Sequence, residues 1–436
     1  MILLCGCLTP AFGTAVRTGG RRAAHGRTSL AGMSDPRRLR LLVLNQYYWP
    51  GVEATAQLLT ELCEALAEDM VVTVVTGVLH GHEDEPRRAV RGGVEIIRVV
   101  STSFERSKLL ARGANYASYL AAALLRSIRG PRPNIVLCMT DPPIVADIAL
   151  LAARRFRAPL VVISQDVFPE IAVQLKRLEN PLLMSLLRGL VGLYLRRADR
   201  IVAIGDTMRL RLEEKGAHPE RLRVIPNWID TTRLGPLDKA NPWARNIGLD
   251  KKFVVMHSGN VGHAQDLDSL VRAATFLRDL DDLQVMIIGT GARHAELVAL
   301  AKLLEVDQVR FLYYQSRGVL PQSLSAADVH VVGLAPGLAG YVVPSRLYGI
   351  LAVGRPVIAA ADAESETAQV VQSIGCGLVV PSGRPELLAR AIRDAHDGKY
   401  DLEAMGARGR EWVQREADRT VAVSRYRNLL FELARP

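Results

Sequence analysis

Short apolar runs alternate with amphipathic segments from Leu39 to the end of the chain. The run "RLLVLNQ" is typical of a buried strand, and "EATAQLLTELCEALAE" after it carries apolar residues at helical spacing. This alternation continues to residue 225 and restarts near residue 251. Apolar strands separated by helices predict parallel sheets that helices cover on both faces. We therefore expect an α/β protein with two Rossmann-like, doubly wound domains that face each other across a cleft.

The alternation is interrupted once, and this predicts the domain boundaries. Residues 226–250 are polar and rich in proline, which indicates a linker between a first domain at 37–225 and a second at 251–415. The last segment, 416–436, is expected to form a helix that returns to the first domain. Parallel sheets of this kind bind ligands at the carboxyl ends of their strands, so the predicted site lies in the cleft.

The first 36 residues differ from the rest of the chain. Residues 17–32 are polar and rich in arginine and glycine, which predicts disorder. The apolar run before them lacks the basic segment that precedes the core of a signal peptide. We interpret Met33 as the true start and expect a chain beginning there to keep its stability and ligand affinity. No apolar run reaches about 20 residues, so no membrane span is expected.

The net charge of +10 restricts the possible partners. Either the base composition of the gene or contact with anionic phosphate or lipid explains the excess of arginine. No basic segment interleaved with aromatic residues is present, so a nucleic-acid partner is not expected. The five cysteines lack zinc-site spacing, and Cys63 and Cys138 lie in apolar runs that predict core positions.

Three loops that follow strands of the second domain carry the first candidate chemistry. Glycines allow backbone amides to approach a phosphate, and an arginine binds phosphate oxygens with two hydrogen bonds. Simple turns would explain each glycine pair equally well, but three such loops in one cleft favour a diphosphate site. The residues concerned are Gly259, Gly262, Gly289, Gly291, and Ser345 with Arg346 at the start of a helix in "VVPSRLYG".

In the first domain, polar residues follow strands at the edge that faces the same cleft. Asp166, after Gln165 in "QDVFPE", either contacts a ligand in the cleft or caps a helix. Glu53 either contacts a ligand in the cleft or caps its helix, and Gly51 lies in the same loop. Asp141 begins "DPP", a rigid turn beside them.

Ten motifs, in this order, carry a resemblance to a known family. In the first domain they are "NQYYWPG", "TDPP", "QDVFPE", "ADRIVAIGD" and "VIPNWID". In the second domain they are "SGNVGHAQDLDSL", "IIGTG", "AADVHVVGL", "VPSRLYGILAVGRPVIAA" and "CGLVVPSG". The chain resembles the retaining GT-B glycosyltransferases of family four. It is most similar to the colanic-acid and O-antigen branch, which includes the N-acetylfucosaminyl-type transferases.

The resemblance implies a function. The second domain would bind a nucleotide diphosphate-sugar, with UDP as the expected nucleotide, and the first domain a lipid-linked saccharide such as an undecaprenyl-diphosphate sugar. The transferred sugar would be an N-acetylated amino or deoxy sugar, and transfer would retain its configuration. Asp166 would orient the acceptor or the transferred sugar as a catalytic residue, and Glu53 would contact sugar hydroxyls. No cofactor or metal is expected, since "DLD" at 266–268 opens a helix and is interpreted as a cap.

The resemblance also implies a location in the cytoplasm, at the inner face of the plasma membrane. Residues 103–130 mix apolar residues with arginines, so this segment either contacts anionic lipid or is an ordinary amphipathic helix. Residues 182–197 are expected to form a core helix.

The chain departs from the family at two positions. Tyr341 and Gly349 occupy the places of two family glutamates, one of which contacts the donor ribose. Glu364 or Glu366 is expected to replace that contact. The predicted nucleotide site also includes Tyr313 and Tyr314, and the predicted diphosphate site includes Asn260 and Gln265. A nucleotide-sugar 2-epimerase of the same fold and a non-catalytic binding protein remain alternatives.

Overall fold

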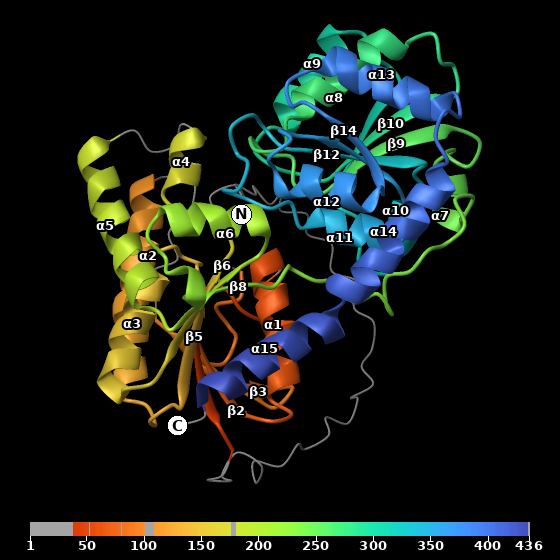
Figure 1. The fold of residues 1–436 in the computed structure, drawn as a ribbon. Coiled ribbons are helices and arrows are strands. Elements are labelled where there is room, and N and C mark those ends of the chain that lie inside the picture. The colour runs from red at the N-terminus through yellow and green to blue at the C-terminus, as the bar shows by residue number, and fades with distance from the viewer. Residues whose placement is uncertain (1–37, 52, 80, 101–108, 176–179, 435–436) are drawn as a thin grey trace.

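The computed structural model describes residues 38–434 except 52, 80, 101–108 and 176–179, and it describes only the backbone of residues 109–114. Two sheets form the centres of two α/β domains, as predicted (Figure 1). The predicted tail at 1–36 and the Met33 start lie outside the described residues.

The first sheet has eight strands in the order β3-β4-β2-β1-β5-β6-β7-β8. All neighbouring strands are parallel except β3 and β4, which form an antiparallel pair at one edge. The sequence did not predict β3, because its four residues are mostly exposed and lack an apolar pattern. The strands are β1 (Arg40–Leu44), β2 (Val71–Gly77), β3 (Arg88–Arg91), β4 (Val94–Val99), β5 (Ile135–Met139), β6 (Leu160–Ser164), β7 (Arg200–Ala203) and β8 (Leu222–Val224).

The second sheet has six parallel strands in the order β11-β10-β9-β12-β13-β14. The chain moves outward in one direction from β9 to β11 and then crosses to β12 on the other side of β9. Loops diverge at such a crossing point, which is where α/β sheets bind ligands. The strands are β9 (Phe253–Ser258), β10 (Leu283–Ile288), β11 (Val309–Leu312), β12 (Val329–Gly333), β13 (Val357–Ala360) and β14 (Gly377–Val380).

Helices cover both faces of the first sheet. One buried cluster joins the sheet to α2, α3, α5 and α6, and another joins it to α1 and α15. Tyr426 and Leu430 of α15 thus pack in the first domain, although the chain reaches them after the second domain. The helices concerned are α1 (Ala54–Leu66), α2 (Leu109–Ile128), α3 (Val145–Phe156), α4 (Glu170–Gln174), α5 (Pro181–Arg197), α6 (Asp206–Glu214), the 3-10 helix η3 (Pro219–Arg221) and α15 (Arg419–Ala434).

Residues 226–250 are more ordered than the predicted linker. Asn241 accepts a hydrogen bond from the N–H of Ala244 and so caps the short helix α7. Ala244 and Leu249 are buried against Val254 of β9. Part of this segment therefore belongs to the second domain, because its few apolar residues pack under the sheet. The other helices of this domain are α7 (Pro242–Asn246), α8 (Leu267–Ala273), the 3-10 helix η4 (Ala274–Leu277), α9 (His294–Leu303), α10 (Leu320–Ser325), α11 (Arg346–Ala352), α12 (Glu366–Ile374), α13 (Pro385–His396) and α14 (Leu402–Glu416).

The two domains touch where the carboxyl ends of their strands face each other. The N–H of Val167, just after β6, donates to the carbonyl of Tyr341 at 2.9 Å. The guanidinium of Arg211 in α6 lies 5.0 Å from the centre of the Tyr341 ring. The segment before α11 is therefore held against the first domain.

The prediction of a core helix at 182–197 is wrong for its outer face. Helix α5 buries Met184, Val191 and Leu195, but Leu182 and Leu186 are 82% and 61% exposed. The run is apolar on all sides, and only one side has a sheet to cover it. Among the residues that the structure describes, no helix is both long and apolar enough to cross a bilayer.

Candidate functional site

Two of the glycine loops of the second domain pack directly on each other. The N–H of Gly259 donates to the carbonyl of Ile288, and the N–H of Val261 donates to that of Thr290, both at 2.9 Å. A side chain at Gly289 would begin 1.8 Å from the carbonyl oxygen of Gly259, and one at Gly291 would begin 2.2 Å from that of Val261. Contact between the loops therefore explains why these positions are glycine.

Arg346 brings the third loop to the same place. Its Nη1 lies 2.9 Å from Nε2 of His257, and its guanidinium carbon lies 3.4 Å from the point where a side chain on Gly259 would begin. No described carboxylate forms an ion pair with Arg346. Burial lowers the pKa of Arg346 to about 10, despite an opposing interaction with Tyr314. The three predicted loops thus meet around a cation that lacks a counter-ion within the described chain.

His257 was not among the predicted residues. It lies in β9 and is fully buried. Burial and the charge of Arg346 hold its pKa well below the usual value, so the ring is neutral and can contact a guanidinium without repulsion. A histidine that directly follows the apolar run "FVVM", two residues before the first glycine of the loop, is the sequence signal that would have indicated it.

Other residues of these loops have different roles from those predicted. Ser345 occupies the N-cap position of α11, but its side chain makes no capping hydrogen bond. The N–H of Gly262 was expected to bind a phosphate. It instead donates to Oε1 of Gln265 at 2.9 Å. The long Gln265 side chain folds back and satisfies its own loop. Oδ1 of Asn260 is buried and has no hydrogen-bond partner among the described residues.

The residues predicted to contact the nucleotide are divided between two places. Tyr313 and Tyr314 follow β11, and their side chains are 69% and 50% exposed. Tyr314 lies beside Gly289. Tyr313 stacks on His294 with the ring centres 5.7 Å apart. These exposed rings stand at the rim of the Arg346 loops, where a planar group could stack on them.

Glu366, the first residue of α12, instead reaches across to the first domain. Its carboxylate accepts hydrogen bonds from the N–H and the hydroxyl of Thr207 in α6, both at 2.9 Å. Gly205 is required there, because a side chain would collide with this carboxylate. Glu364 is exposed in the preceding loop. In this conformation Glu366 therefore joins the domains.

Three carboxylates influence one another at the edge of the first domain. Asp141 is fully buried and accepts a hydrogen bond from the hydroxyl of Thr55 at 2.9 Å. Burial is the main cause that raises the pKa of Asp141 to about 7; the charges of Glu53 and Asp166 add to it, and the hydrogen bond from Thr55 opposes it. The structure thus brings together three acidic residues that are far apart in the sequence. A buried carboxyl near other carboxylates holds its proton, as Asp141 does here.

The capping alternatives for two of these residues are excluded. The N-cap of α4 is Pro169, so Asp166 does not cap that helix. The backbone of Asp166 instead bridges to Val342 of the second domain. Glu53 stands at the N-cap of α1, but its side chain makes no capping hydrogen bond. A side chain at Gly51 would begin 2.6 Å from Oε2 of Glu53, so this glycine makes room for the carboxylate.

Gln165 is held by a reciprocal amide pair. Its Nε2 donates to Oδ1 of Asn227 at 3.2 Å, and Nδ2 of Asn227 donates to its Oε1 at 3.0 Å. Both residues are buried. Gln165 therefore fixes the end of β6 to the segment that leaves the first domain.

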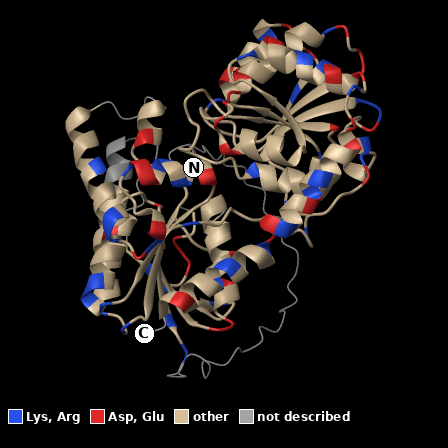
Figure 2. Ribbon diagram, viewed as in Figure 1, with Lys and Arg blue, Asp and Glu red and all other residues tan. Residues whose placement is uncertain are grey.

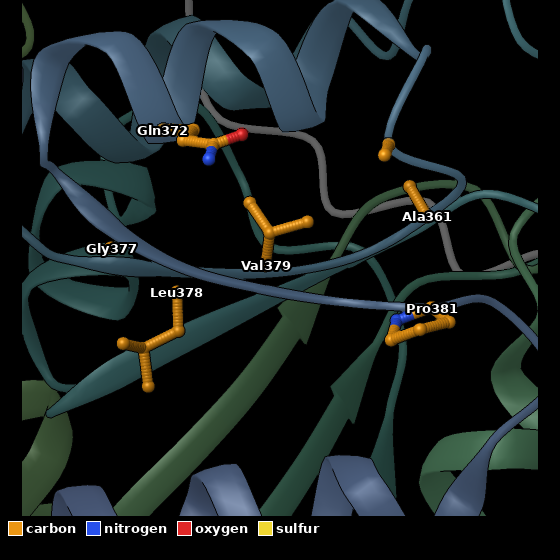
Figure 3. Close-up of a pocket in the computed structure, with 7 residues that line it drawn as sticks. Ala361, Gln372, Gly377, Leu378, Val379 and Pro381 are labelled. Atoms are coloured by element: carbon orange, nitrogen blue, oxygen red, sulfur yellow. The ribbon is translucent and has the colours of Figure 1, made fainter.

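An open hollow of about 500 Å³ lies beside the edge strand β14 (Figure 3). Ala361, Gln372 and Leu378 are among the residues that line it, and none of the predicted site residues does. It is therefore separate from the Arg346 loops. Within the described ranges, no three histidine, cysteine, aspartate or glutamate side chains are grouped as a metal site would require.

Comparison with known protein families decides the identity. Residues 53–228 match the "Glycosyl transferase 4-like domain", and residues 240–412 match "Glycosyl transferases group 1". The chain belongs to the group 1 glycosyl transferases. The two matches cover the two domains that carry the acidic cluster and the Arg346 loops.

Individual relatives agree with this family. This glycosyltransferase is 28% identical to the probable glycosyltransferase WbjE of Pseudomonas aeruginosa, over 74% of this chain and 80% of that protein. It is 30% identical to the putative colanic acid biosynthesis glycosyl transferase WcaI of Escherichia coli (strain K12), over 54% of this chain and 57% of that protein. Among solved structures, Anabaena HepE in complex with UDP-glucose has the same fold, with a TM-score of 0.70 at 14% identity over 91% of this chain and all of that one.

Proposed function

We propose that this glycosyltransferase moves a sugar from a UDP-sugar to a lipid-linked saccharide during synthesis of a cell-surface polysaccharide, with retention of configuration. The observation that carries the proposal is Arg346, a partly buried guanidinium without a described counter-ion beside two glycine loops. A diphosphate supplies two negative charges to such a site, and charge-assisted hydrogen bonds to arginine are among the strongest in proteins.

The relatives support the class of the donor and the biosynthetic setting. HepE was solved with UDP-glucose, which is a nucleotide diphosphate-sugar. WcaI is named for colanic acid biosynthesis, which is the synthesis of a polysaccharide. In the proposed arrangement, Arg346 and Asn260 contact the diphosphate, and Tyr314 lies beside the nucleotide. The N–H groups of Gly259, Val261 and Gly262 donate to other groups of the protein, so the side chains of Arg346 and Asn260 carry the proposed contact.

The proposed reaction breaks the bond between the anomeric carbon and the diphosphate oxygen and forms a bond from that carbon to an acceptor hydroxyl oxygen. The proton of that hydroxyl passes to the departing diphosphate on the same face of the sugar. The second domain stabilises the diphosphate as its charge develops. Asp166 and Glu53 of the first domain accept hydrogen bonds from sugar hydroxyls and orient them, and neutral Asp141 supports their position.

Calorimetric titration with UDP-, GDP- and ADP-sugars tests the donor class. We expect UDP-sugars to bind and Arg346→Ala to weaken that binding, while substitution of Arg272, an exposed arginine in α8, by alanine leaves it unchanged. Unchanged affinity in Arg346→Ala would contradict the proposal. Incubation of a UDP-sugar without acceptor provides a second test, because formation of an epimer would indicate the epimerase alternative.

A further inference from the structure

Helix α5 carries an apolar stripe on its exposed side. Leu182, Leu186, Gly189 and Leu193 follow one another at intervals of four, three and four residues, which places them on one face of a helix. These three leucines are 82%, 61% and 36% exposed. Exposed leucines are normal when scattered, but a continuous stripe on one helix indicates a surface that another apolar phase covers.

The charges around this stripe have one sign. Helix α5 contains three arginines and no acidic residue. Arg188 pairs with Glu170, whereas Arg196 and Arg197 form no ion pair with any described residue. Arginines in the last turn of a helix are favourable for the helix itself, but that does not explain leucines that point outward.

The neighbouring helix α3 extends the same surface. Its Leu151 is 48% exposed, and Arg154 and Arg155 follow one turn later. A hollow of about 340 Å³ between the ends of α3 and α5 is lined by Arg154, Arg157 and Arg197, with Asp199 as its acidic residue. The Asp199 carboxylate is already engaged, because it accepts a hydrogen bond from the N–H of Leu160 at 2.8 Å. The hollow is therefore cationic.

We infer that the outer face of α3 and α5 docks on a bilayer that contains anionic phospholipid. The leucines enter the boundary between headgroups and acyl chains, and a lipid phosphate occupies the arginine-lined hollow. In Figure 2 this face carries Lys and Arg along the outer side of the first domain. The inference rests on the proposed function, because a lipid-linked acceptor must reach the cleft from a membrane. Arg188 of α5 pairs with Glu170, the first residue of α4, and α4 follows Asp166, so the face extends toward the cleft edge.

This surface differs from the segment for which the sequence left lipid contact open as one of two alternatives. Within the predicted segment 103–130, the side chains described begin at Asn115, and Leu125 is the exposed large apolar one among them. The stripe on α5 was interpreted as core from the sequence. Its position on the outer side of the domain is a result of the tertiary structure.

Vesicle flotation tests the apolar part. The full chain is mixed with vesicles of phosphatidylglycerol and phosphatidylcholine, or with vesicles of phosphatidylcholine alone. Replacing Leu182, Leu186 and Leu193 together by Gln should lower partitioning to the anionic vesicles by about tenfold or more. These side chains are exposed, so the fold should tolerate the change. Leu303→Gln is the matched control, since Leu303 is 79% exposed on α9 of the second domain.

The charged part has its own variants. Arg154→Gln with Arg197→Gln should weaken partitioning by about fivefold for each arginine, and Arg272→Gln should not. Equal binding of wild type to both kinds of vesicle, or a leucine variant that binds as wild type, would overturn the inference. Light scattering gives a further contradicting outcome. If the wild type forms dimers and the leucine variant does not, a second copy of the chain covers this face, and the inference is overturned.

Donor binding separates this inference from the proposed function. The triple leucine variant should keep its UDP-sugar affinity by calorimetry while losing vesicle binding, which supports both. If both variants still bind vesicles as wild type does and donor affinity is intact, only the docking surface is removed. Failure of the wild type to bind any nucleotide-sugar would remove the proposed function.

Discussion

The two cleft-facing edges of this glycosyltransferase have opposite chemistry. The first domain presents Glu53, Asp141 and Asp166, and burial, with a smaller contribution from the other two carboxylates, raises the pKa of Asp141 to about 7. The second domain presents Arg346 between glycine loops, with a neutral His257 beside it. Both edges are formed in the same way, by loops at the carboxyl ends of parallel strands. Similar folds therefore provide one edge that repels a diphosphate and one that attracts it.

This difference assigns the substrates by charge. Carboxylates accept hydrogen bonds from sugar hydroxyls, whereas an arginine without a counter-ion binds phosphate oxygens. Only the orientation in which the diphosphate lies against the second domain avoids repulsion from the acidic cluster. Four experiments can break or sharpen this contrast.

The largest effect is expected for Asp166→Asn, which keeps the shape of the side chain and removes its charge. If the acidic edge orients the acceptor or the transferred sugar, turnover should fall by roughly 100-fold, as positioning losses often do. Donor affinity should change by no more than about twofold, because the nucleotide binds in the other domain. Steady-state rates with a lipid-linked acceptor and calorimetry with UDP-sugar measure the two quantities.

The control for this variant is Asp84→Asn, an exposed aspartate in the same domain, which should leave both quantities unchanged. A turnover near wild type in Asp166→Asn would show that Asp166 matters only for its backbone bridge to Val342. The acidic edge would then lose its role in the reaction.

Arg346→Ala tests the cationic edge. Loss of a charge-assisted hydrogen bond should weaken UDP-sugar binding by about 1.5–3 kcal/mol. Arg346→Lys should recover only part of this, because an ammonium group lacks the paired donors of a guanidinium. If both variants bind the donor as wild type does, the contrast between the edges has no functional meaning.

The third prediction concerns pH. Asp141 titrates near 3.8 when unfolded and near 7 when folded, so the native state binds one more proton between these values. Stability should therefore fall as pH rises from about 4 to about 7, by at most about 1.4 kcal/mol per pH unit for this group. Asp141→Asn should flatten that slope in thermal unfolding measured across the range.

Part of the slope should remain in Asp141→Asn, because burial also raises the pKa of Asp147 to about 7. The double variant with Asp147→Asn should remove most of it. A slope that neither substitution changes would show that these carboxyls are ionised in the native protein.

The smallest effect is expected at the contact between domains. Glu366 is predicted to contact the donor ribose, but it is engaged by Thr207. Thr207→Val removes one of the two hydrogen bonds, so it should tighten UDP-sugar binding by about two- to fivefold if Glu366 must leave Thr207 to reach the ribose. Glu366→Gln should weaken binding. Weaker binding in Thr207→Val would show that the contact instead assists the donor-bound conformation.

Local patterns were sufficient for much of this protein. Buried strands such as Val71–Gly77 are recognisable because they are apolar on both faces, and amphipathic helices such as α13 because their apolar residues recur at helical spacing. Their alternation predicted two doubly wound domains. The order of ten motifs indicated a glycosyltransferase family, and the comparison with family models confirmed it.

Contacts between distant segments were decided only by the tertiary structure. His257 supports Arg346 across 89 positions of sequence, and Glu366 meets Thr207 across 159. Gln265 uses the amide of Gly262, a choice that depends on the exact path of one loop. The sequence of α5 specifies an apolar helix, but the sheet beneath it determines which leucines remain outside. Hydrophobic periodicity is a local property that a chain carries along its length, whereas partners, exposure and shifted pKa values arise only when remote segments meet.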